Sequence, residues 1–500
     1  MQAANNRILK PIKSVSSQVW PLLIIVPVLS LLAAYLVVNE SWQLALGVLL
    51  AIPGFILLHR HPWLALVIWL SLAPFLLHTP TADERRLYWI IHRALPPITL
   101  GIIILGSALQ LTHRRLPKLG LPELAMAGYV IVSLFSIWAL NDSPLATTFL
   151  FYDRVFIPIC LYLIVRLTIQ DSHSARRLLP VLVFLVISQS IIGILSWYWP
   201  QVLPSEWLTQ AGSRTIGSVV NASVYTTTLT LAGLLVFHAG MNSNNVIFRR
   251  FAVFTLLLAG YCIFVSFSRA SWLAGILVLV GLLFIYPRFT LKTTLIVSAV
   301  LLVFGGWLLS DQIQWAQARF RSAESEQSAL SRLPVYYAAM RMFEDRPLTG
   351  WGYGNFDLYD WRFQERVAGL PSDNKDHASH NLYLTTIAEQ GILGLGFLLI
   401  PALWLLFLSF KAFPQMPKNG FWSRKLLVIL WLVILSHIIV NNFSNMRVVF
   451  GLGMWWITLG LIASLVYPYQ KSLSRKNHSY QTGDLRLPDI KTNDHSSITR

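Results

Sequence analysis

The feature that most constrains this chain is a series of long apolar segments, which follow one another with few charges inside them. Apart from one longer segment, each is roughly 16 to 24 residues long, the length that an α-helix needs to cross the hydrocarbon core of a bilayer. The candidate spans are Val19–Val38, Gln43–Leu58, Trp63–His78, Pro97–Thr112, Pro122–Leu140, Phe149–Leu167, Leu178–Trp199, Val219–Ala239, Phe251–Phe267, Ser271–Tyr286, Thr293–Ser310, Leu382–Phe410, Leu426–Phe443 and Val448–Tyr467. The series predicts an all-α polytopic membrane protein with about 12 to 14 transmembrane helices, the lower number applying if some short early segments are re-entrant.

Composition supports a membrane protein and excludes several other classes. The chain is 55% hydrophobic and 12% charged, whereas a soluble chain is about a quarter charged. Its two cysteines, Cys160 and Cys262, both lie in apolar segments, so they indicate neither a disulfide framework nor a metal cluster. The net charge of +17 is scattered over short loops. Such charges set topology and contact anionic lipid headgroups, and they do not indicate a nucleic-acid partner.

The basic residues recur in alternate loops, which predicts the orientation of the chain. They are Arg7, Lys10, Lys13, Arg60, Arg114, Arg115, Lys118, Arg176, Arg177, Arg249, Arg250, Arg288, Lys292, Lys411, Lys418, Arg424 and Lys425. Because cytoplasmic loops are enriched in Lys and Arg, we expect these loops to be cytoplasmic. Arg85, Arg86 and Arg93 break the alternation. Either the early spans are counted differently, or these arginines bind an anionic group.

This orientation divides the chain into five regions. We expect a cytoplasmic amino terminus over residues 1–18, a transmembrane bundle over 19–310, a large extracytoplasmic loop over 311–379, further transmembrane helices over 380–468 and a polar cytoplasmic tail over 469–500. Within the loop, Gln312–Phe343 is compatible with helix, and Pro334 is expected in the first turn of a second helix. Pro347 should end that helix before the run Gly350-Trp351-Gly352-Tyr353-Gly354, whose glycines allow tight turns.

His380 lies where the loop meets the next apolar span, and it is the candidate general base. Ser379 or Asn381 can cap the helix that follows. The positive end of that helix disfavours imidazolium, and a neutral histidine can accept a proton near neutral pH. A polar interfacial histidine without a chemical role is the alternative. His377 and His380 form an H-x-x-H pair, but no third ligand has a fixed spacing, so we predict no metal site.

Two arginines lie where topology alone would not place them. Arg214 just precedes a span, and Arg269 lies between two spans with almost no loop. A guanidinium can donate two parallel hydrogen bonds to phosphate oxygens, so both are candidates to hold a pyrophosphate, with Ser268 as a neutral donor. Headgroup contact is the alternative. Arg154 is a weaker candidate because Asp153 can neutralise it, and Glu389 is expected to stabilise its helix or line a cavity.

Several of these stretches resemble the O-antigen ligase / O-antigen polymerase superfamily. The run Ser379-His380-Asn381-Leu382-Tyr383-Leu384 with Glu389-Gln390-Gly391, preceded by Pro347 to Phe356, is similar to segments of that family in the same order. The stretch Phe267-Ser268-Arg269-Ala270-Ser271-Trp272-Leu273 is similar to its Ser-Arg-(small)-x-Trp segment. The resemblance covers roughly residues 213 to 450.

The resemblance implies a metal-independent glycosyltransferase of the outer face of the bacterial inner membrane. Its donor would be a glycan on undecaprenyl pyrophosphate, and its acceptor a lipid or another glycan. His380 matches the family's proposed base, and Arg269 and Arg214 match arginines thought to hold the pyrophosphate. We expect His377, Asn381 and Ser268 to contact substrate beside them. The chain shows no nucleotide-binding motif, so we predict no cofactor.

The sequence is compatible with three activities within that superfamily and with one function outside it. A ligase transfers the glycan to a lipid core, a polymerase to another lipid-linked glycan, and a protein O-oligosaccharyltransferase to a protein, all from the same kind of donor site. A polytopic glycolipid transporter is the alternative of another class. A transporter would show internal repeats and paired charges near the membrane midplane. Here the polar residues gather at the outer face, which favours an enzyme.

Overall fold

The computed structural model describes residues 53–77, 81–111, 116–209, 214–321, 332–364, 379–444 and 447–481, together with residues 34, 35, 38 and 330. The regular secondary structure of this part of the chain is helical, apart from one isolated bridge between Leu208 and Thr215. The longer helices are α3 (Leu64–Leu72), α5 (Leu95–Ala108), α6 (Leu121–Leu140), α8 (Ile157–Thr168), α10 (Leu179–Tyr198), α11 (Ala222–Met241), α12 (Val246–Val265), α13 (Arg269–Ile285), α14 (Pro287–Leu308), α15 (Ser310–Arg321), α17 (Arg332–Asp345), α19 (Leu382–Ala412), α20 (Arg424–Asn441) and α21 (Val449–Gln481). The shorter elements used below are α4 (Ala82–Tyr88), η2 (Trp89–Ala94), α7 (Pro144–Phe151), η3 (Tyr152–Phe156) and α9 (Ser172–Arg176).

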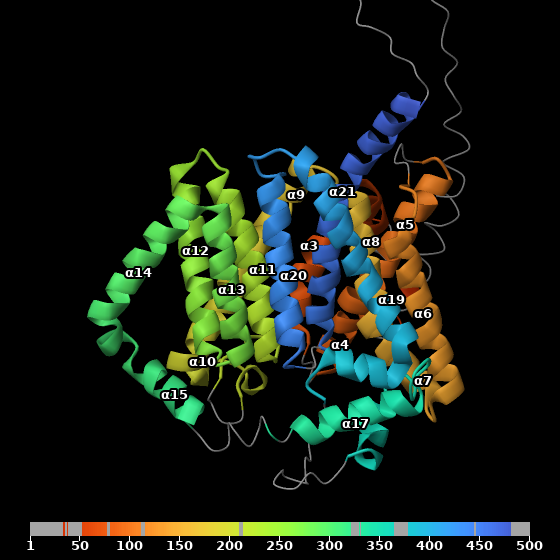
Figure 1. Ribbon diagram of the computed structural model, residues 1–500, viewed down its shortest axis with the longest axis horizontal. Helices are drawn as coiled ribbons and strands as arrows, with labels where there is room; N and C mark the ends of the chain where they lie inside the picture. Colours follow the sequence, from red (N-terminus) through yellow and green to blue (C-terminus); the bar gives the residue numbers. More distant parts are fainter. Residues whose placement is uncertain are drawn as a thin grey trace, which may run out of the picture.

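The long helices form one bundle in which neighbouring helices run side by side (Figure 1). Within the described residues, 10 helices are long and apolar enough to span a membrane, or up to 11 if the bent pair Pro53–Arg60 and Leu64–Phe75 is one span. The shorter apolar helix α13 joins them in the bundle. The fold class predicted from the sequence, an all-α polytopic membrane protein, is therefore confirmed. The predicted span Val19–Val38 lies almost wholly outside the described residues.

Burial separates central helices from those at the edge. In α11 and α21, 94% and 89% of the most apolar stretch is buried, compared with 11% in α14. Figure 1 shows α14 standing apart at one side of the bundle. An apolar helix surface left uncovered by protein is stable only against lipid, so α14 is expected to face the bilayer.

The central helix α11 is rich in hydroxyl groups, which its own backbone satisfies. Thr227, Thr228 and Thr230 each donate a hydrogen bond to a backbone carbonyl three or four residues earlier. A threonine in this conformation hides its polar atom from the surrounding apolar side chains. This allows a sequence that is less apolar than its neighbours to fill the centre of the bundle.

The two ends of the bundle differ in chemistry. Helix α17 lies across one end, which we call the α17 end, where α11, α13, α19 and α21 begin (Figure 1). The opposite end carries α9 and the turns between α11 and α12 and between α19 and α20. Basic residues collect there: Arg176, Arg177, Arg249, Arg250, Lys411, Lys418, Arg424 and Lys425.

The loop ahead of α19 folds as the sequence predicts. Pro334 lies in the first turn of α17, and α17 ends at Asp345, two residues before Pro347. Gly350, Gly352 and Gly354 all have positive φ angles, which glycine adopts at little cost. This turn packs against α19, because Trp351 N donates to Ala388 O at 3.0 Å and Gly352 N donates to Glu389 O at 2.8 Å.

Helix α19 bends sharply where the turn meets it. Gly391 has φ +61° and interrupts the helix. Ile392 N therefore bonds outside the helix, donating to Pro347 O at 2.9 Å. The part before the bend lies near the α17 end, and the part after it crosses the bundle (Figure 1). The bend thus places the start of α19, with His380 just before it, at the α17 end.

Candidate active site at the α17 end

His380 is held at the start of α19 by its neighbours. Asn381 is the N-cap, and its side-chain oxygen accepts hydrogen bonds from Tyr383 N and Leu384 N, both at 3.0 Å. On the other side of His380, the buried Ser379 hydroxyl donates to Asn381 O at 2.9 Å. His380 itself is half-buried with φ +51°, a left-handed conformation that a side chain adopts only when its surroundings impose it. The predicted cap at Asn381 is confirmed.

Arg269 occupies the first turn of α13. Ser268 caps this helix and accepts hydrogen bonds from Ser271 N at 3.4 Å and from Ser271 Oγ at 2.9 Å. Ser271 also shares a hydrogen bond of 2.6 Å with Thr226 in α11. Ser268 is thus tied into the helix start, while Arg269 is exposed. The serines therefore hold the helix start from which the exposed Arg269 side chain extends.

Arg214 lies on the segment that leads into α11. The next residue, Thr215, is buried, pairs with Leu208 in the isolated bridge and accepts a hydrogen bond from Ser196 of α10 at 3.2 Å. Arg214 is exposed and makes no hydrogen bond or ion pair with any residue that the structure describes. Its backbone is therefore anchored while its charge is available.

The structure brings both arginines to the same helix end. Ser196, which contacts the segment of Arg214, is adjacent to Trp197 of α10, whose ring lies 5.5 Å from that of Phe267, two residues before Arg269. The residue after His380 is linked to α13 through α20. Asn381 Nδ2 donates to Asn442 O at 3.3 Å, at the end of α20, and α20 packs along α13. His377 lies outside the described residues.

The sequence did not identify the ion pair that holds the bend of α19. Arg447 donates to both carboxylate oxygens of Glu389, at 2.9 and 2.5 Å. Burial lowers the pKa of Arg447, but the Glu389 carboxylate raises it further, so the guanidinium stays charged. Glu389 Oε1 also accepts from Phe356 N at 3.2 Å. The signal was present, because a carboxylate inside an apolar span needs a cationic partner, and the sequence places Arg447 between two spans at the same end.

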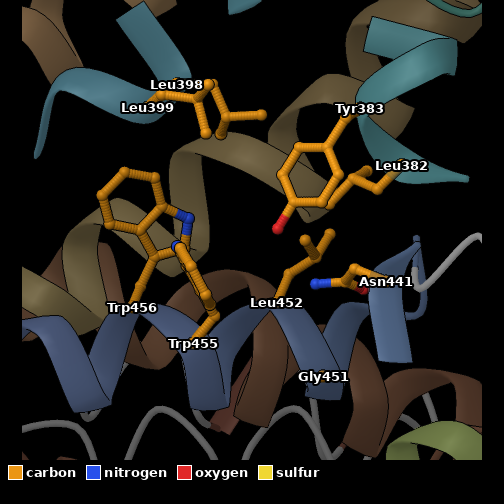
Figure 2. Close-up of a pocket in the computed structure, with 9 residues that line it drawn as sticks. All are labelled: Leu382, Tyr383, Leu398, Leu399, Asn441, Gly451, Leu452, Trp455 and Trp456. Carbon is orange, nitrogen blue, oxygen red and sulfur yellow. The ribbon is translucent and has the colours of Figure 1, made fainter. Parts of the chain in front are cut away.

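A pocket lies inside the bend of α19. Leu382 and Tyr383 line it from before the bend, and Leu398 and Leu399 from after it. Asn441, Gly451, Leu452, Trp455 and Trp456 complete the lining from α20 and α21. Figure 2 shows the Tyr383 hydroxyl pointing into this pocket between the leucines and the indole rings. The pocket begins two residues after His380, but neither His380 nor the two arginines line it.

The prediction that Asp153 neutralises Arg154 is wrong. Asp153 accepts two hydrogen bonds from Arg93, from Nε at 2.8 Å and from Nη2 at 2.7 Å. Arg93 and Asp153 lie on two π-helical turns, η2 and η3, which pack against each other. Arg93 was one of three arginines that broke the alternation of basic loops. The structure shows that the anionic group bound by Arg93 is a carboxylate of the same chain. Arg86 likewise contacts Asp83, at 3.2 Å.

Comparison with known proteins relates part of the chain to a family. Residues 254–399 match a family model described as O-antigen ligase. This stretch contains Arg269, the loop ahead of α19, His380 and Glu389. A search of curated proteins found no match.

Proposed function

We propose that this protein, whose residues 254–399 match a family model described as O-antigen ligase, transfers a glycan from an undecaprenyl-pyrophosphate carrier to an acceptor hydroxyl. The observation that carries the proposal is the gathering of His380, Arg269 and Arg214 at one end of a membrane bundle. Arg214 and Arg269 are exposed, and residues next to them contact α10. His380, held in a left-handed conformation, precedes α19 at the same end of the bundle. The match of residues 254–399 to the O-antigen ligase family model supports glycan transfer as the chemistry.

The chemistry that these residues can perform is an in-line displacement at a sugar carbon. Arg214 and Arg269 would bind the two phosphates and offset the negative charge that grows on the leaving pyrophosphate. Neutral His380 would take the proton from the acceptor hydroxyl as its oxygen attacks the anomeric carbon. The new glycosidic C–O bond forms as the C–O bond to the pyrophosphate breaks. Attack from the opposite side inverts the configuration of the anomeric carbon.

The distribution of charge supports a site on the outer face of the bacterial inner membrane. Basic side chains collect at the end of the bundle opposite α17. The positive-inside rule assigns such an end to the cytoplasm. The α17 end, with His380 and the two arginines, would then face the periplasm, where lipid-linked glycans are exposed after export.

The decisive experiment compares purified wild type with His380→Ala, using undecaprenyl-pyrophosphate-linked glycan as donor and a lipid core, a second lipid-linked glycan or a protein as acceptor. Loss of a general base is expected to lower transfer by about a hundredfold or more, while donor binding persists. The acceptor that is used by wild type identifies the protein as ligase, polymerase or protein O-oligosaccharyltransferase. Products are followed by gel electrophoresis and mass spectrometry.

The matched control is His173→Ala, because His173 is exposed on α9 at the opposite end of the bundle. It should transfer as wild type does. Equal transfer by His380→Ala and wild type would remove His380 from the reaction. Movement of the glycolipid across a bilayer without transfer to any acceptor would replace the enzyme with a transporter.

A further inference from the structure

The backbone around His380 is closed by the hydroxyl group of the residue before it. Ser379 Oγ donates a hydrogen bond to Asn381 O at 2.9 Å and accepts one from Asn381 N at 3.2 Å. One side chain thus binds both backbone groups of the residue that follows His380. Ser379 is fully buried, so water does not compete for these hydrogen bonds and the low dielectric of the interior strengthens them.

A second buried hydroxyl group reinforces this closure from the first turn of α19. Thr385 Oγ1 is hydrogen-bonded to Ser379 Oγ and donates to Asn381 O at 3.0 Å. Thr385 is fully buried as well. The enclosed residue, His380, has φ +51°, a left-handed conformation that is uncommon for a residue with a Cβ atom. The two hydroxyl groups therefore hold His380 in a backbone conformation that sets the direction of its side chain.

The side chain of Asn381 joins the same segment to the end of α20. Asn381 Nδ2 donates to Asn442 O at 3.3 Å and to Asn442 Oδ1 at 3.4 Å, while Asn381 Oδ1 caps α19. Asn442 is itself fixed, because its Nδ2 donates to Ile438 O at 2.9 Å. Both polar atoms of the Asn381 amide are thus engaged within the protein. These contacts favour a positioning role for Asn381 over the substrate contact that the sequence suggested.

Helix α20 also contacts the helix that begins at Arg269. It packs along α13, and α13 begins where α20 ends, at the α17 end of the bundle (Figure 1). The contact of Asn381 with Asn442 therefore ties the segment of His380 to a helix that packs beside α13. Placement matters here, because a general base must lie within hydrogen-bonding reach of the hydroxyl that it deprotonates. A displacement of about 1 Å can lower a rate by about a hundredfold.

We propose that Ser379 and Asn381 are positioning residues for His380. Ser379 imposes the backbone conformation from which the imidazole extends, and Asn381 fixes that segment against α20. Both act through His380 and not by touching substrate. This inference rests on the proposed function, because it assigns how the proposed base is aimed at the acceptor hydroxyl.

The test measures kcat and the donor KM for Ser379→Ala and Asn381→Ser. Ser379→Ala removes the closing hydroxyl group. Asn381→Ser keeps a good helix cap but removes the amide group that bonds to Asn442. Each substitution should lower kcat by about tenfold to a hundredfold and leave the donor KM unchanged. A merely structural role would reduce the amount of folded protein, measured by size-exclusion chromatography, and leave kcat per folded molecule unchanged.

Double variants show whether these side chains act through the base. Ser379→Ala and Asn381→Ser are each combined with His380→Ala, and the remaining transfer rate is measured. If both residues act only by aiming His380, each double variant should transfer at the rate of His380→Ala alone. A further fall as large as that seen with His380 present would overturn the proposal. So would a wild-type kcat in both single variants.

Matched controls lie at the opposite end of the bundle (Figure 1). Ser174→Ala removes a buried hydroxyl group that accepts hydrogen bonds from Gln170 N and Asp171 N, both at 3.1 Å. Asn245→Ser exchanges the cap of α12, whose Oδ1 accepts from Ile247 N at 2.8 Å. Both variants should keep the wild-type kcat, because neither side chain contacts the segment of His380.

The same assay distinguishes failure of this inference from failure of the proposed function. Absence of transfer by wild type to any acceptor, or equal transfer by wild type and His380→Ala, would overturn the proposed function or its base, and this inference with it. Transfer that requires His380 but is unaffected by Ser379→Ala and Asn381→Ser would overturn this inference alone.

Discussion

At the scale of single residues, the buried ion pair between Glu389 and Arg447 contributes to stability through both partners together. Removing one partner leaves the other charge buried and unpaired, which typically costs about 3 to 5 kcal/mol. We expect Glu389→Gln and Arg447→Gln each to lower the thermal unfolding midpoint strongly. The double variant should be less destabilised than the sum of the two, since neither charge is then left alone.

The exposed pair Arg341 and Glu344 on α17 provides the matched control. Its atoms are 3.7 Å apart, and both side chains are more than half exposed. Exposed pairs contribute about 0 to 1 kcal/mol, so Glu344→Gln should change the unfolding midpoint little. An equal effect of Glu344→Gln and Glu389→Gln would show that burial does not distinguish the two pairs.

Arg269 and His380 should also differ in which kinetic constant they control. Arg269→Gln weakens binding of the pyrophosphate, so we expect the KM for donor to rise about tenfold or more. His380→Ala should lower kcat with little change in that KM. Steady-state assays at varied donor concentration separate the two effects. A fall in kcat alone for Arg269→Gln would contradict a role in holding the donor.

At the scale of elements, the bend of α19 decides where the candidate base lies. A Cβ atom at Gly391 would lie 2.3 Å from Leu348 O, and the φ of +61° is one that side chains rarely adopt. Gly391→Ala should therefore straighten α19 or detach the turn at 347–352, and transfer activity should fall with stability. Activity is measured after the folded fraction is determined by size-exclusion chromatography.

Gly396 is a control on the same helix after the bend. Nothing lies within 4 Å of a Cβ atom built there, and alanine favours helix over glycine by about 1 kcal/mol. Gly396→Ala should leave transfer unchanged and stability equal or slightly greater. If both substitutions reduced activity equally, the cause would be the loss of glycine from α19 in general and not the bend.

At the scale of the whole molecule, the orientation of the bundle can be tested by labelling. Cys160 and Cys262 are buried, so they should not react with a membrane-impermeant maleimide. Glu344→Cys on α17 should be labelled in intact spheroplasts, and Lys418→Cys at the opposite end only after permeabilisation. The reverse pattern would place the candidate site in the cytoplasm and exclude a donor on the outer face.

Local sequence was sufficient for the features that depend on neighbours along the chain. Apolar length predicted the spans, Ser379 or Asn381 was predicted as the cap of α19, and Pro334 and Pro347 predicted the limits of α17. These are local effects, because a cap, a proline or an apolar run acts within one or two turns of helix. The short motifs around Arg269 and His380 were recognisable for the same reason, and the family match covers both.

Tertiary structure decided which charges are paired and which remain available. Glu389 and Arg447 are 58 residues apart, and Arg93 and Asp153 are 60 apart. The sequence placed Asp153 next to Arg154, yet the π-helical turns direct its carboxylate to Arg93 and leave Arg154 without a counter-ion among the described residues. Adjacent side chains on a helix point in different directions, so only the packing of distant helices determines the partner of a buried charge. The sequence by itself therefore determined that this is a membrane bundle with His380 just before an apolar span, and the packing of distant helices determined which of its arginines are paired with carboxylates.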